Sequence, residues 1–69
     1  MKYKVGDKIT VRDDLITGES YGGCDYIELM SAFLAQNKNG RVLTVRAIDE
    51  YGYMAEECFW CWTDEMLES

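Results

Sequence analysis

The sequence predicts a small domain that is mainly β with one helix, an α+β fold. Two observations support this prediction. Several short segments are rich in β-branched and aromatic residues and are separated by turn residues, whereas one segment has the apolar spacing of an α-helix. The length of 69 residues fits a single domain spanning residues 1–69. A chain of this length can bury only a thin hydrophobic core.

The first strand is predicted at residues 8–12, where polar and apolar residues alternate and place Ile9 and Val11 on one face. The residues that follow, 13–23, are polar and include glycines. They predict a long connecting loop.

A helix is predicted at residues 26–35, where apolar residues recur at i, i+1, i+4, i+7 and i+8. Asp25 stands at the N-cap position, and Glu28 follows three residues later as in a capping box. Residues 37–40 contain asparagine and glycine and should end the helix. The apolar stripe is expected to pack into the core rather than against a partner.

The second half of the chain predicts three strands joined by hairpin turns. The strands are residues 41–48, 51–55 and 58–62, and the turns are Asp49-Glu50 and a tight connection at Glu56-Glu57. Thr63 is expected to cap a final turn at 64–67. This element order is that of a small, partly open SH3-like barrel with an α-helix inserted after the first strand; a helix packed on a three-stranded sheet is the alternative.

The charge is unevenly distributed along the chain. Residues 1–46 contain seven basic and six acidic residues, whereas residues 47–69 contain seven acids and no base, for a net charge of −6. Such a field disfavours direct nucleic-acid binding and favours a basic protein surface. The residues expected to contact a partner are Asp49, Glu50, Glu56, Glu57, Phe59, Trp60, Asp64 and Glu65. For the acids, solvated turn positions are the alternative interpretation, which also applies to Asp13-Asp14.

Aromatic residues crowd the last predicted strands. Alternation places Trp60 and Trp62 on one face and Phe59 on the other. We expect Trp62 in the core and either Trp60 or Phe59 partly exposed. Exposed aromatic side chains are common anchors of protein interfaces.

Three cysteines allow a metal-binding interpretation. Cys58 and Cys61 have the CxxC spacing, and Cys24 could supply a third thiolate of a structural zinc site. Since the chain has no histidine, the fourth ligand would be a carboxylate or water, with Asp25 beside Cys24 and Glu56 and Glu57 beside Cys58 as the candidates. Ordinary small core residues are the alternative for all three thiols. A redox role fits less well, because Glu56 and Glu57 would raise the pKa of the first thiol of the pair.

Enzyme machinery is not evident in the sequence, and we expect a protein without catalytic activity. The chain has no histidine, no serine or cysteine beside a base, and no phosphate-binding glycine motif. It also has no apolar stretch of membrane-spanning length and no signal-peptide core, so the protein is expected in the cytoplasm, without disulfides.

The chain resembles a family of small phage and prophage proteins with SH3-like folds. The resemblance covers nearly the whole chain and is carried by the segments 6–8, 11–12, 14–15, 21–23, Met30, 40–42, 51–53 and 62–67, the last of which reads Trp-Thr-Asp-Glu-Met-Leu. Cys24, Cys58 and Cys61 depart from the family pattern. The resemblance implies a mobile-element protein that binds host machinery, with anti-CRISPR proteins as an example.

Two functions follow as hypotheses. The first is a phage-encoded inhibitor that blocks a basic surface of a host defence nuclease, such as a type II CRISPR effector, and interferes with DNA loading. The second is an SH3-like adaptor or structural phage module that recognises a protein through its aromatic C-terminal hairpin.

Overall fold

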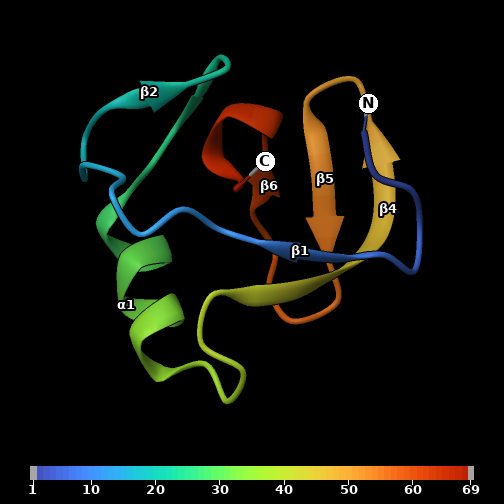
Figure 1. The fold of residues 1–69 in the computed structure, drawn as a ribbon. Helices are drawn as coiled ribbons and strands as arrows, with labels where there is room; N and C mark the ends of the chain where they lie inside the picture. Colours follow the sequence, from blue (N-terminus) through green and yellow to red (C-terminus); the bar gives the residue numbers. More distant parts are fainter. Residues whose placement is uncertain (1, 69) are drawn as a thin grey trace.

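The computed structural model describes residues 2–68 and consists mostly of strands with one helix, as the sequence predicts (Figure 1). The elements in chain order are β1 (Lys8–Thr10), β2 (Ser20–Tyr21), β3 (Cys24–Asp25), α1 (Glu28–Gln36), β4 (Val42–Asp49), β5 (Gly52–Ala55), β6 (Cys61–Trp62) and the 3-10 turn η1 (Asp64–Met66). Between residues 2 and 68, no helix has the length and apolar character needed to cross a membrane.

The main sheet is antiparallel, in the order β1-β4-β5-β6, and does not close into a barrel. The long strand β4 joins its two halves: Leu43 pairs with Ile9 of β1, and after a bulge Ile48 pairs with Tyr53 of β5. β2 and β3 form a separate two-stranded sheet.

The C-terminal residues pair with residues 10–12, at and just beyond the end of β1. Val11 forms a bridge with Leu67, the Arg12 N–H donates to the Met66 carbonyl at 2.8 Å, and the Glu68 N–H donates to the Thr10 carbonyl at 2.8 Å. The predicted first strand is shorter than 8–12, because the ladder with β4 ends at Thr10. Beyond it, the Val11 N–H donates to the Arg41 carbonyl at 2.9 Å, while Val11 bridges Leu67 on its other side.

The segment predicted as a loop, 13–23, contains β2 and leads into the β2–β3 hairpin, so that prediction is wrong in part. Tyr21 pairs with Cys24 across Gly22-Gly23, whose φ angles of 61° and 88° are those of a type I′ turn. Strands of two residues are too short to leave an alternating pattern in the sequence, and the paired glycines carry the only local signal.

The helix begins at Glu28 rather than Tyr26, and the predicted capping box does not form. Asp25 pairs with Ser20 in β3, and the N-cap is Ile27, which makes no side-chain capping bond. The Tyr26 N–H extends the hairpin by donating to the Glu19 carbonyl at 2.9 Å. The hairpin thus holds the backbone that the capping box would have needed.

The last strand is also shorter than predicted, since only Cys61 and Trp62 pair with β5. The connection at Glu56-Glu57 is not a tight hairpin, because both residues form hydrogen bonds to Thr44 of β4. The Glu56 N–H donates to the Thr44 carbonyl at 2.9 Å, and the Glu57 carboxylate accepts from the Thr44 N–H and hydroxyl, each at 3.0 Å. Residues 56–60 therefore form a wide connection.

The core lies between the main sheet, α1 and the C-terminal turn. Trp62 is fully buried, as predicted, and so are Tyr53 and Met66. The helical stripe contributes Met30 and Leu34, which confirms that most of this face packs inward, whereas Ile27 of the same stripe is exposed. The remaining core residues are Ile9, Val11, Tyr26, Leu43, Val45, Ala55 and Leu67.

Candidate functional site

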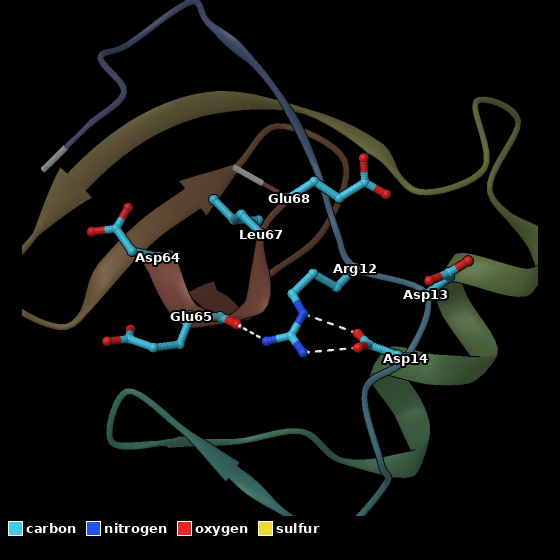
Figure 2. Close-up of a pocket in the computed structure, with 7 residues that line it drawn as sticks. All are labelled: Arg12, Asp13, Asp14, Asp64, Glu65, Leu67 and Glu68. Atoms are coloured by element: carbon cyan, nitrogen blue, oxygen red, sulfur yellow. Dashed lines mark hydrogen bonds and ion pairs between the residues drawn. The ribbon is translucent and has the colours of Figure 1, made fainter.

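An open acidic hollow with a volume of about 490 Å³ lies where the residues after β1 meet η1 and the C-terminal tail (Figure 2). Its lining residues are Arg12, Asp13, Asp14, Asp64, Glu65, Leu67 and Glu68. Five carboxylates against one guanidinium give this hollow a formal charge of −4. The pairing of β1 with the tail brings the two acidic segments together.

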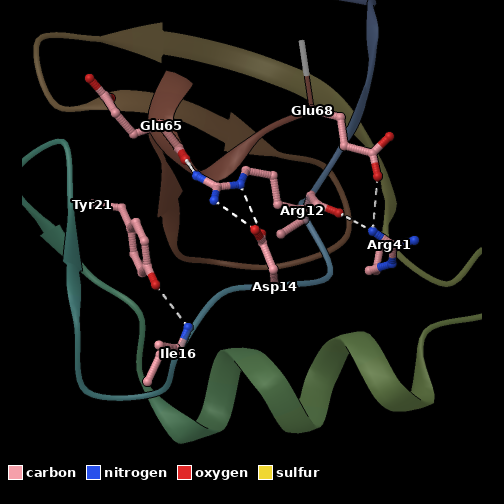
Figure 3. Close-up of polar contacts among 8 residues, drawn as sticks. Arg12, Asp14, Ile16, Tyr21, Arg41, Glu65 and Glu68 are labelled. Carbon is pink, nitrogen blue, oxygen red and sulfur yellow. Dashed lines mark hydrogen bonds and ion pairs between the residues drawn. The ribbon is translucent and has the colours of Figure 1, made fainter.

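Arg12 holds the two sides of the hollow together (Figure 3). Its guanidinium donates to both carboxylate oxygens of Asp14, each at 2.9 Å, and to the Glu65 carbonyl at 2.8 Å. It also lies 5.9 Å from the centre of the Tyr21 ring. The hydrogen bond between the two side chains raises the pKa of Arg12 and lowers the pKa of Asp14. The one cation of the hollow is therefore engaged within the protein.

The other carboxylates of the hollow differ in whether they form hydrogen bonds or ion pairs within the protein. Asp64 accepts a 2.6 Å hydrogen bond from the Tyr53 hydroxyl, and Glu68 pairs with Arg41 at 3.1 Å. Among the contacts of residues 2–68, the exposed carboxylates of Asp13 and Glu65 take part in no hydrogen bond or ion pair. These two side chains can meet a partner at no cost to an internal contact.

The Tyr53–Asp64 contact predicts an alkaline limit to stability. Burial, and next the hydrogen bond to Asp64, raise the pKa of Tyr53 above its ordinary value of 10.0. Above that pH the unfolded chain loses this proton before the folded chain does, so the free energy of unfolding should fall as pH rises beyond about 10. Tyr53→Phe should cost about 1–2 kcal/mol at neutral pH and lose part of the alkaline dependence, measured by urea unfolding.

Tyr51→Phe is the matched control for that prediction, because the Tyr51 side chain is 67% exposed. It should change the unfolding free energy little at either pH. Equal pH dependence in the native protein and Tyr53→Phe would contradict the assignment to Tyr53.

The structure separates most of the acids predicted as partner contacts. Asp49 ends β4 and Glu50 lies in the turn before β5, whereas Glu56 and Glu57 follow the other end of β5. Asp49 accepts from the N–H groups of Tyr51 at 2.8 Å and Gly52 at 3.1 Å, so its carboxylate shapes the turn. The Glu57 carboxylate is bound to β4. Glu50 and Glu56 are exposed.

Asp64 and Glu65 are the predicted partner contacts that the structure places in the hollow. Their neighbours in the hollow, Asp13, Asp14 and Glu68, were not predicted as partner contacts. The pair Asp13-Asp14 was visible in the sequence as a turn, but nothing local indicates that β1 pairs with residues 66–68.

The predicted aromatic contacts lie outside the residues that line the hollow. Phe59 is 92% exposed, which confirms the expectation that one of the aromatic residues of this segment reaches solvent. Trp60 is half-buried, and its ring lies 5.8 Å from that of Phe33 on α1, at an angle of 60°.

The three cysteines and Asp25 are not gathered into one metal-binding group. Among residues 2–68, no three cysteine, aspartate or glutamate side chains lie in an arrangement that could hold a metal ion. The Trp62 indole N–H donates to the Cys58 sulfur at 3.3 Å, and burial raises the pKa of this thiol. A structural zinc stays a prediction, for metal analysis of purified protein to test.

No family model matches this chain, and no match was found among curated proteins or solved structures.

Proposed function

We propose that this chain is a non-catalytic binding protein whose acidic hollow docks onto a basic surface of a partner protein. The observation that carries the proposal is the meeting of five carboxylates around one internally engaged arginine. Asp13 and Glu65 supply charge that no internal partner neutralises in the described contacts. A field of this sign steers a basic partner toward the hollow and repels nucleic acid.

The fold proposed for this function is a partly open SH3-like barrel. The strand order β1-β4-β5-β6 and the pairing of the tail with residues 10–12 support this arrangement. In such a fold the connections carry the binding residues, and the hollow here is built from two connections.

The partner proposed is a host defence nuclease in the cytoplasm, with a type II CRISPR effector as the named case. The family resemblance supplies this context, and the charge of the hollow is compatible with it. The DNA channels of such nucleases are strongly positive, so an acidic domain seated there would hinder loading of target DNA.

The test is inhibition of target-DNA binding by a purified, guide-loaded type II CRISPR nuclease. The native chain should compete with DNA, and the double variant Asp13→Lys with Glu65→Lys should lose about tenfold or more in apparent affinity. Both side chains are exposed and unbonded in the contacts described above, so folding should survive.

The matched control is Glu50→Lys with Glu56→Lys, two exposed acids that do not line the hollow. Each double variant changes the net charge from −6 to −2, because each acid-to-lysine change adds two charges. Equal losses in the two variants would make net charge, not the hollow, responsible. A native chain that fails to compete would exclude this partner class.

A second candidate function is a peptide adaptor, and the 92% exposure of Phe59 favours it. An exposed phenylalanine beside half-buried Trp60 offers an apolar anchor for a peptide. Salt distinguishes the two functions. Docking through the hollow should weaken steeply between about 0.05 and 0.5 M salt, whereas binding through Phe59 should change little and be lost in Phe59→Ala.

A further inference from the structure

The two cysteines of the CxxC sequence lie on opposite sides of the last strand. Trp62 is fully buried and pairs with the buried Tyr53, so these side chains share the inner face of the sheet. Cys61 is the preceding residue and pairs with Met54, which places it on the outer face. Cys58 is on the inner side, since its sulfur accepts the indole hydrogen bond of the buried Trp62.

The β2–β3 hairpin is held against that outer face. Thr63 lies two residues after Cys61 in extended backbone and so shares its side of the chain. The Thr63 hydroxyl donates to the Tyr21 carbonyl at 2.8 Å, and a Cβ placed on Gly22 would lie 3.0 Å from the Thr63 Cβ. Tyr21 pairs directly with Cys24, so this contact brings Cys24 toward Cys61.

We propose that Cys24 and Cys61 are a site of reversible oxidation and form a disulfide that joins the β2–β3 hairpin to β6. Both thiols are half-buried and are free in the structure. The co-reactant is a small-molecule disulfide such as oxidised glutathione. One cysteine thiolate attacks a sulfur of that disulfide and releases one glutathione thiolate. The second cysteine thiolate then attacks the mixed disulfide and releases the other.

Protons, electrons and bonds balance in this thiol–disulfide exchange. The protein loses two protons and two electrons, one sulfur–sulfur bond forms, and the small disulfide is reduced to two thiols. Burial, followed by the negative charges of Asp49 and of Cys24, raises the pKa of Cys61. The effect of Cys24 on the pKa of Cys61 agrees with a short distance between the two side chains. Because a raised pKa leaves less thiolate, oxidation should become faster as pH rises from 7 to 9.

The disulfide would fix the hairpin beside the hollow. Tyr21 faces the Arg12 guanidinium, and its hydroxyl accepts from the Ile16 N–H at 2.8 Å, so the hairpin lies against the arginine that holds the hollow together (Figure 3). Oxidation should raise the melting temperature by about 10 °C or more, as expected for a cross-link between segments far apart in sequence.

The experiment is incubation of chelator-treated protein with oxidised glutathione, followed by mass spectrometry under non-reducing conditions. The expected product is a monomer that has lost two hydrogen atoms. Cleavage after lysine and arginine should yield residues 13–38, which contain Cys24, linked to residues 47–69. The Cys58→Ser variant should give the same linked product, which identifies Cys61 as the partner.

Cys61→Ser and Cys24→Ser should each abolish the linked product. A native protein that forms only glutathione adducts or intermolecular dimers, or that joins Cys58 to either other cysteine, would overturn the proposal. A second cleavage after the aromatic residues Phe59 and Trp60 separates Cys58 from Cys61, so peptide mapping of the native protein decides this even if a serine variant folds poorly. The outcome is independent of the proposed binding function, because no partner takes part in the assay.

Discussion

Trp62→Ala should destabilise the fold by about 3–5 kcal/mol, the range for removing a large aromatic side chain from a core. Trp62 is fully buried in β6, pairs with Tyr53, and donates its indole hydrogen bond to Cys58. A domain of this size has a thin core, so a loss of this magnitude should leave most chains unfolded at 37 °C. Urea unfolding followed by circular dichroism measures the effect.

Phe59→Ala is the control for that measurement, because it removes an aromatic side chain that is 92% exposed. The free energy of unfolding should change by less than about 0.5 kcal/mol. Similar losses in both variants would contradict the placement of Trp62 in the core and Phe59 at the surface.

Gly52→Ala should lower the free energy of unfolding by about 3 kcal/mol, for two reasons that both concern the added Cβ. Gly52 has φ of 150°, which side chains other than glycine rarely adopt, and a Cβ there would meet the Trp62 carbonyl group. The obstacle is backbone of the neighbouring strand, which cannot rotate away as a side chain can. Thermal unfolding should show a fall in melting temperature of about 10 °C or more.

Gly6→Ala separates strain from collision, since Gly6 has φ of 94° but a Cβ there would meet no atom within 4 Å. The free energy of unfolding of Gly6→Ala should fall only by the strain of the backbone conformation, about 1–2 kcal/mol. If Gly52→Ala were no more harmful than Gly6→Ala, the close approach to Trp62 would be refuted.

The elements predicted best from the sequence are those with long, regular patterns. The strand at 41–48 became β4, Val42–Asp49, and the helical stripe placed Met30 and Leu34 in the core. The two-residue strands of the hairpin have no pattern of their own, because pairing and a glycine turn hold them. Asp25 was predicted as the helix N-cap from its position alone, but its backbone pairs with Ser20 in the β2–β3 hairpin instead.

The candidate site was predictable in charge but not in geometry. The acidic C-terminal block was evident, yet a count of charges does not distinguish a carboxylate used inside the fold from one that is free. Asp49, Glu57 and Asp64 each accept internal hydrogen bonds, whereas Glu65 lies exposed in the hollow. Asp13 joins it only because residues distant in sequence meet at β1.

The pairing of residues 66–68 with residues 10–12 also bears on self-association. Without those residues the Thr10 carbonyl and the Arg12 N–H would lose their partners, and an open strand edge of this kind is a template for pairing with another chain. The C-terminal residues therefore keep two copies of this chain from joining edge to edge, and a variant ending before Met66 should form oligomers that size-exclusion chromatography detects.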